Sequence, residues 1–270
     1  MFTTLISAED LQSLGNDVII LDCRGRLGDP AFGPAAYAAG HLPGACYASL
    51  DDDFADAPGA GGRHPLPDPE RLAARLRRWG VSDSDQVVAY DDAGGAFAAR
   101  IWWCIRSLGH AAVAVLDGGI QAWPGPLSQD PAEPTPGSFS IRPPLTRTVS
   151  ADDVQQRGAG VCLVDARSEA RFRGEEEPID PVAGHIPGAV CLPFQGNLGA
   201  DGRFLPPDAL AARFRDLPDS LICYCGSGVT AAHDVLALRI AGREEPALYP
   251  GSWSEWIRDP ARPIATGDDT

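Results

Sequence analysis

The residues best suited to chemistry lie in one short loop near the end of the chain. The apolar run 221–224 ends at a cysteine, and a loop of small and hydroxyl-bearing residues precedes a helical stretch; these residues are Cys225, Gly226, Ser227, Gly228, Val229 and Thr230. Glycine adopts positive φ at little cost, so this backbone can curl until several N–H groups face one point and bind an anion. We therefore predict a nucleophilic thiolate at Cys225, with the amides from Gly226 to Thr230 binding its substrate.

The loop can stabilise a thiolate without a basic side chain. Lowering the pKa of a thiol by two units takes roughly 2.7 kcal/mol. The N-terminus of the following helix offers up to about 2 kcal/mol, and each hydrogen bond to a charged acceptor adds about 1.5–3 kcal/mol. The hydroxyls of Ser227 and Thr230 are further donors to the sulfur or its adduct. The alternative is a buried structural cysteine beside a glycine-rich turn.

Other cysteine chemistries fit this loop less well. A cysteine phosphatase needs an arginine six residues after the nucleophile to fork onto phosphate, and that residue is Ala231. For a cysteine protease, His233 follows on the same helix and is expected to point elsewhere. Cys223 and Cys225 form a C-x-C pair without the second pair or histidines of a zinc site. We expect neither a metal nor a cofactor.

The elements around this loop occur twice in the chain. Four segments return in the same order, namely 18–26 as 161–169, 38–50 as 182–194, 86–100 as 220–233 and 116–123 as 248–256. Two copies of one domain are implied, 1–124 and 146–270, joined by a proline-rich, semi-extended linker at 125–145. Asp91 occupies the first-copy position that matches Cys225.

Each copy alternates apolar strands with helices. Strands are expected at 18–21, 87–90, 112–116, 161–164, 221–224 and 247–249, amphipathic helices at 69–80 and 207–217, and capped short helices after Ser7 and Ser150. This alternation predicts the α/β class, with each domain a mostly parallel sheet covered by helices on both faces. In such sheets ligands bind beyond the carboxyl ends of the strands, where Cys225 falls.

Composition narrows the partners and the compartment. The net charge of −15 opposes binding to nucleic acid and to anionic membranes. No apolar stretch approaches the length of a membrane span, and the N-terminus lacks an export signal. The seven cysteines show no disulfide spacing, so a reduced, cytoplasmic protein is expected.

The sequence resembles the tandem-domain rhodanese family. The resemblance rests on the paired HLPGA and HIPGA motifs, the paired D-x-R strands and the loop CGSGVT at 225–230, and it covers nearly the whole chain. The loop is similar to that of 3-mercaptopyruvate sulfurtransferases, whereas thiosulfate-using relatives carry basic residues at positions 226 and 227. The resemblance implies a ping-pong reaction in which Cys225 takes sulfur from a small-molecule donor and passes it from a persulfide to cyanide, a thiol or thioredoxin. It also implies that only the second domain is catalytic and that the first covers the site.

The resemblance also suggests roles for individual residues. Arg171 matches the family arginine that binds the anionic group of the donor, and Asp165 with Arg167 matches a structural ion pair near the site. Ser227 would work with the histidine of the first HLPGA motif, His41, and with an aspartate shortly before it, for which Asp29 is the candidate; a structural role for His41 is the alternative. His185, the copy of His41, is expected to be structural.

Two departures from the family pattern stand out. Asp180 replaces a second substrate arginine nine positions after Arg171, with Arg173 as a candidate substitute, and Pro250 interrupts the motif before the last tryptophans. The first departure keeps thiosulfate open as the donor. A non-catalytic sulfur carrier or redox-regulatory module is the alternative from another class.

Overall fold

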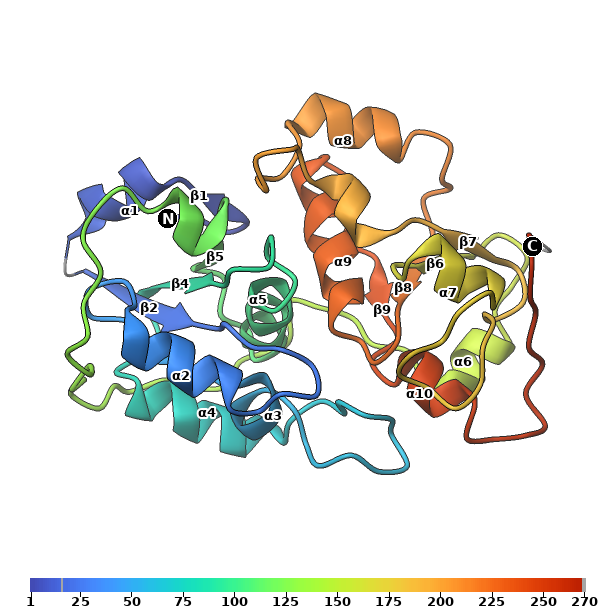
Figure 1. Ribbon diagram of the computed structural model, residues 1–270, viewed down its shortest axis with the longest axis horizontal. Coiled ribbons are helices and arrows are strands. Elements are labelled where there is room, and N and C mark those ends of the chain that lie inside the picture. Colours follow the sequence, from blue (N-terminus) through green and yellow to red (C-terminus); the bar gives the residue numbers. More distant parts are fainter. Residues whose placement is uncertain (16, 269–270) are drawn as a thin grey trace. The chain divides into compact units, whose positions relative to one another are not determined.

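The protein forms two compact units in the computed structural model, which describes residues 1–15 and 17–268 (Figure 1). The first domain comprises Met1–Asp56, Leu66–Thr146 and Ala200–Phe204, and the second comprises Ala57–Pro65, Arg147–Gly199 and Leu205–Thr270. Each domain thus includes one short segment from the other half of the sequence. The boundaries predicted from the repeat do not anticipate this exchange.

Each domain is built on a parallel sheet. The first sheet has the order β1-β5-β4-β2-β3, with strands β1 (Leu5–Ile6), β2 (Val18–Asp22), β3 (Cys46–Tyr47), β4 (Gln86–Tyr90) and β5 (Val113–Leu116). The second has the order β7-β6-β8-β9, with strands β6 (Cys162–Asp165), β7 (Ala189–Cys191), β8 (Leu221–Tyr224) and β9 (Ala247–Leu248). All pairs of neighbouring strands are parallel. The predicted α/β class is confirmed.

The helices follow the predicted alternation. In the first domain they are α1 (Ala8–Leu14), α2 (Phe32–Ala39), α3 (Leu50–Asp53), α4 (Pro69–Arg78), α5 (Ala98–Ser107) and η1 (Gly119–Ala122). In the second they are α6 (Ala151–Gln155), α7 (Glu169–Arg173), η2 (Phe194–Asn197), α8 (Pro207–Arg213), α9 (Thr230–Ile240) and α10 (Ser252–Trp256). Helix α5 packs on β4 and β5, and α9 packs on β8 and β9. No helix among the described residues is long and apolar enough to cross a bilayer.

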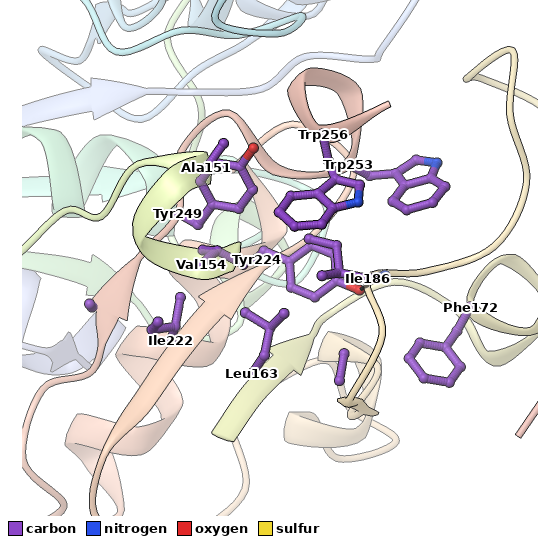
Figure 2. Packing of buried hydrophobic residues seen from close by; sticks show 12 residues of the cluster. Ala151, Val154, Leu163, Phe172, Ile186, Ile222, Tyr224, Tyr249, Trp253 and Trp256 are labelled. Carbon is purple, nitrogen blue, oxygen red and sulfur yellow. Dashed lines mark hydrogen bonds between the residues drawn. The ribbon is translucent and has the colours of Figure 1, made fainter. Parts of the chain in front are cut away.

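The core of the second domain fixes the strand that leads to Cys225. Tyr224, the last residue of β8, is fully buried with Trp253 and Ile186, and the hydroxyl oxygen of Tyr224 accepts a hydrogen bond of 3.2 Å from the Ile186 amide (Figure 2). Because aromatic rings bury large areas, this packing holds the last residue of β8 in the core, next to the start of the loop.

The predicted linker is ordered along the first domain. Hydrogen bonds hold it along its length, among them Arg77 Nε to the Phe139 carbonyl at 2.8 Å, and the amides of Ser138 and Ser140 to the side chains of Ser82 and Asp83 at 3.1 and 2.7 Å. These bonds keep an irregular, proline-rich segment in one path without regular secondary structure.

Candidate active site

Cys225 lies at the carboxyl end of β8, and α9 begins five residues later at Thr230. Gly228 has φ of 77°, in the left-handed region that favours glycine, whereas Gly226 lies outside that region, so positive φ is used at Gly228 and not at Gly226. Cys225, Ser227 and Val229 are buried. Val229 is the N-cap of α9 and makes no side-chain hydrogen bond to the helix. The first N–H groups of α9 therefore have no capping side chain and point towards the loop.

Helix α10 orients the backbone of the loop. The amides of Trp253 and Ser254 donate to the carbonyls of Cys225 and Gly226 at 3.0 and 2.8 Å. In a trans peptide the C=O and N–H groups point in opposite directions, so the amides of Gly226 and Ser227 point away from α10. The Cys225 amide donates to Ser252 Oγ at 3.1 Å, which fixes the start of the loop.

The first domain shows what the corresponding loop does with an anion. The carboxylate of Asp91 accepts four hydrogen bonds from the loop and from the start of α5, from the amides of Ala93, Gly95, Phe97 and Ala98, at 2.8–2.9 Å. Burial raises the pKa of the Asp91 carboxyl, and the four amides oppose that rise. This loop runs through seven residues, 91–97, before α5, whereas the second-domain loop runs through five, 225–229, before α9. The first copy is therefore an amide nest filled by its own carboxylate.

Ser227 is paired with His64 in the second domain. The Ser227 Oγ and His64 Nδ1 atoms lie 2.7 Å apart. His64 comes from the segment Ala57–Pro65, which belongs to the second domain although it is encoded in the first half. The segment packs tightly there, because a Cβ on Gly62 would lie 2.7 Å from Ser254 Oγ and 2.8 Å from the Gly251 carbonyl oxygen.

The structure gives Ser227 the partner His64, and the expected partners His41 and Asp29 make other contacts. His41 is fully buried, stacks on Tyr37 at 3.8 Å, and has its ring nitrogens 2.8 and 3.0 Å from the carbonyl oxygens of Tyr37 and Asp130. Asp29 is exposed and caps a turn through the Ala31 amide, at 3.2 Å. The contacts of both residues lie within the first domain.

The second copy repeats the arrangement of His41. His185 is fully buried, stacks on Phe172 at 3.7 Å, and its Nδ1 lies 2.8 Å from the Phe172 carbonyl oxygen. A histidine with the same contacts in both domains belongs to the scaffold that the copies share.

Two arginines and two carboxylates gather beside Gly226. A Cβ on Gly226 would lie 2.9 Å from Arg63 Nη2 and 3.4 Å from Arg171 Nη2. Asp180 bridges the two guanidinium groups: its Oδ1 pairs with Arg63 Nη1 and its Oδ2 lies 3.2 Å from Arg171 Nη2. Glu177 binds the Nε and Nη2 atoms of Arg171 at 2.8–3.1 Å. Burial alone raises the pKa of the Glu177 carboxyl, but Arg171 and nearby amides bring that pKa below its usual value.

The D-x-R pair, Asp165 and Arg167, forms a buried ion pair. Arg167 forks onto both oxygens of Asp165 at 2.7–3.1 Å, both side chains are buried, and the Arg167 guanidinium lies 4.9 Å from the Trp253 ring centroid. Asp22 and Arg24 form the same fork in the first domain. Arg173, the candidate substitute for a second substrate arginine, is half-buried and pairs with Asp268 at 2.7 Å.

Burial makes the remaining thiols poor nucleophiles. It raises the pKa of six cysteines, to about 11 for Cys46, to about 12 for Cys191, and also for Cys23, Cys104, Cys162 and Cys223. A thiol with a raised pKa stays protonated at neutral pH, and the thiolate is the reactive form. All seven cysteines are free, and no cluster of potential metal ligands occurs among the described residues.

A buried carboxyl lies one turn into α9. Burial raises the pKa of Asp234 to about 8, while Asn197 Nδ2 donates to its Oδ1 at 2.7 Å and opposes the rise. Asp234 is therefore largely neutral at pH 7, so the helix behind the nucleophile carries little added negative charge.

Comparison with known proteins agrees with this architecture. The rhodanese-like domain family matches residues 7–125 and 150–259. The chain is 52% identical over 266 residues to a probable 3-mercaptopyruvate sulfurtransferase of Pseudomonas aeruginosa, covering 93% of each chain. It is 44% identical over 285 residues to the putative thiosulfate sulfurtransferase SseB of Mycobacterium tuberculosis, covering 97% of each. The solved structure of the 3-mercaptopyruvate sulfurtransferase SseA from Escherichia coli matches with a TM-score of 0.82 at 31% identity, over 94% of this chain and all of that one.

The parallel sheets, the duplicated loops and these matches define a protein of the rhodanese class. The chain belongs to the rhodanese family and carries two copies of its domain. The relatives named above are sulfurtransferases, so the predicted family and enzyme class are confirmed.

Sequence reasoning missed His64 and Arg63, and a signal for them exists. The segment GGRHPLP at 61–67 aligns with DGRFLPP at 201–207, so His64 corresponds to Phe204 in the sequence repeat. A residue that differs between two copies of a domain is a better candidate for chemistry than one that both retain.

Proposed function

We propose that this protein is a sulfurtransferase that takes sulfur from 3-mercaptopyruvate, holds it as a persulfide on Cys225, and passes it to a thiophilic acceptor. The observation that carries the choice of donor is the 2.7 Å contact between Ser227 Oγ and His64 Nδ1, within two residues of the nucleophile. The filled nest at Asp91 supports the binding of negative charge by the matching loop.

In the first half-reaction the Cys225 thiolate attacks the sulfur of the donor. A new S–S bond forms, the carbon–sulfur bond of 3-mercaptopyruvate breaks, and its electron pair passes to the carbon as the enolate of pyruvate. The enolate needs a proton to become pyruvate, and the thiol proton of the donor is released from the new persulfide. The Ser227–His64 pair carries a proton between these positions and donates a hydrogen bond to the developing oxyanion.

In the second half-reaction the acceptor attacks the outer sulfur of the persulfide. The S–S bond breaks, its electron pair returns to Cys225 as a thiolate, and the acceptor leaves with the sulfur atom. Loop amides stabilise the negative charge on Cys225 before and after transfer. A small thiol or cyanide serves as acceptor, and thioredoxin is the protein acceptor that we propose.

The need for a proton separates two donors. The leaving group of thiosulfate is sulfite, which departs as a stable anion, whereas the enolate of pyruvate must be protonated. A hydroxyl–imidazole pair therefore accelerates transfer from 3-mercaptopyruvate and adds little to transfer from thiosulfate.

The experiment compares kcat/KM for both donors, with cyanide as acceptor, in the native protein, Ser227→Ala and His64→Gln. General acid–base catalysis contributes about 10²–10⁴-fold, so each variant should lose about 10²-fold or more with 3-mercaptopyruvate and less than about tenfold with thiosulfate. Cys225→Ser is the blank. Equal losses for both donors would remove the reason for choosing 3-mercaptopyruvate, and a native preference for thiosulfate would make thiosulfate the donor.

The same assay addresses the non-catalytic alternative. A sulfur carrier releases one sulfur per Cys225 and stops, whereas an enzyme releases many, and mass spectrometry of the Cys225 peptide records the persulfide in either case. We also propose a cytoplasmic location, which seven free thiols support because disulfides persist in oxidising compartments.

A further inference from the structure

The guanidinium group of Arg63 lies beside the loop that contains Cys225, although Arg63 is encoded in the first half of the sequence. Its amide donates to Ser254 Oγ at 3.0 Å, and the preceding turn is closed by reciprocal hydrogen bonds of 3.0 Å between Gly59 and Gly62. The backbone of Arg63 is therefore fixed beside α10, and its side chain, 23% exposed, reaches the loop at Gly226.

The hydrogen bonds of the two arginines leave a matched pair of donors facing the loop. Asp180 accepts a hydrogen bond from Nη1 of Arg63. Glu177 accepts hydrogen bonds from Nε and Nη2 of Arg171, and Asp180 accepts a further one from Nη2. Within the described part of the chain, no partner is found for Nη2 of Arg63 or Nη1 of Arg171. A Cβ on Gly226 would lie 2.9 Å from the first atom and 3.5 Å from the second. Both amino groups thus meet in the space that glycine leaves open.

The local charge balance makes Arg63 decisive. Arg171 pairs with two carboxylates, Glu177 and Asp180, so these three side chains together carry a net charge of −1. When Arg63 is included, the two cations and the two carboxylates sum to zero. The whole protein carries −15 and repels an anionic donor, so a site that attracts one needs every nearby cation.

We propose that Arg63 is the specificity-determining residue for an anionic sulfur donor: Arg63 Nη2 and Arg171 Nη1 bind its carboxylate, and Asp180 positions both guanidinium groups. This inference rests on the sulfur-transfer function proposed above. The proposal also gives Asp180 a role: its carboxylate orients Arg63, which the segment Ala57–Pro65 supplies.

The first test measures anion binding without any sulfur donor. Second-order rate constants for alkylation of Cys225 are measured with iodoacetate, an anion, and iodoacetamide, its neutral analogue, with the modified peptide identified by mass spectrometry. The ratio of the two rates cancels changes in the intrinsic reactivity of the thiolate. Arg63→Met should lower this ratio about tenfold or more, because a hydrogen bond to a charged group contributes about that factor.

Two variants control for lost charge and lost structure. Arg173→Met removes the same charge from the exposed face of α7 and should leave the ratio within about twofold, as expected of a screened surface charge. Arg63→Lys keeps the charge without the fork and should retain part of the ratio. An unchanged iodoacetamide rate in Arg63→Met shows an intact loop. A ratio unchanged in Arg63→Met overturns the proposal.

The second test uses 3-mercaptopyruvate. Arg63→Met should raise KM about 10- to 100-fold with a smaller change in kcat, because the carboxylate is bound in the ground state and the transition state alike. A lowered alkylation ratio with an unchanged KM would overturn the claim that the donor carboxylate lies there. Absence of turnover in the native protein would refute the proposed function and leave the alkylation result to decide the role of Arg63.

Discussion

Ser252 holds the start of the nucleophile loop from a strained backbone position. It is the one residue other than glycine with positive φ in the described part of the chain, at 53°, and it is fully buried. Its Oγ accepts the Cys225 amide at 3.1 Å and donates to the Tyr249 carbonyl at 2.8 Å. In the first domain Gly119 has φ of 60°, and the amide after it binds the carbonyl of Asp91 as the Trp253 amide binds that of Cys225. The first copy thus has glycine where the second copy has a strained serine.

The magnitudes follow from these contacts. A non-glycine residue in the left-handed region costs about 1–2 kcal/mol. Loss of the hydroxyl leaves the buried Cys225 amide without its acceptor, at about 1–3 kcal/mol. Ser252→Ala should therefore destabilise by about 1–3 kcal/mol with the strain retained. Ser252→Gly relieves the strain but adds about 0.5–1 kcal/mol of chain entropy, so it should be the more stable variant by about 0.5–1 kcal/mol.

Activity should follow a different order from stability. Both variants lose the hydroxyl that fixes Cys225, so both should lose a similar factor in kcat/KM, about tenfold or more, since small displacements of a nucleophile are costly. Urea denaturation gives the stabilities, with equal m-values as the check on a common native state. If Ser252→Gly is less stable than Ser252→Ala, the backbone at residue 252 is not strained. If both variants keep full activity, Ser252 does not position Cys225.

Two further predictions concern buried carboxyls. Asp91→Ala should destabilise by about 2–4 kcal/mol because four buried amides lose their acceptor, and formate should restore part of the loss by entering the nest, whereas the neighbouring Asp92→Ala should cost about 0.5 kcal/mol or less; denaturation with and without formate measures this. The pKa of Asp234 is raised from 3.8 to about 8, so its stabilising contribution is complete below pH 3.8 and is lost as the pH rises towards 8. The unfolding free energy of Asp234→Asn minus that of the native protein should therefore rise across this window, and a flat difference would contradict the raised pKa.

The predicted parts of the fold are those encoded in local sequence. The strand before Cys225, the loop and the start of the helix near Val229 and Thr230 were predictable because an apolar run, glycines and a helical pattern adjoin one another. The capping box predicted at Ser150 is present, with Asp153 as its partner. Duplication doubled each of these signals, since a segment that occurs twice in the same order is hard to misread.

The missed residues depend on tertiary structure. His64 and Arg63 lie in a glycine- and proline-rich segment with no periodicity, and nothing local indicates that this segment packs in the second domain. The motif that makes His41 a candidate recurs at His185, and both histidines stack on an aromatic ring and contact a backbone carbonyl oxygen. The strain at Ser252 is likewise invisible in sequence, because serine rarely takes positive φ.

The exchanged segments give the first half of the sequence a part in the proposed site of the second domain. The second domain as a sequence, residues 146–270, contains Cys225 and Arg171 but lacks both the imidazole beside Ser227 and the second cation beside Gly226. Those groups arrive with Ala57–Pro65, while Ala200–Phe204 belongs in turn to the first domain, where the Phe204 amide donates to Asp117 at 2.9 Å. Residues 57–65 therefore supply groups to the proposed site that residues 146–270 do not contain, whereas the matching position of the first copy holds Asp91 in place of a thiol.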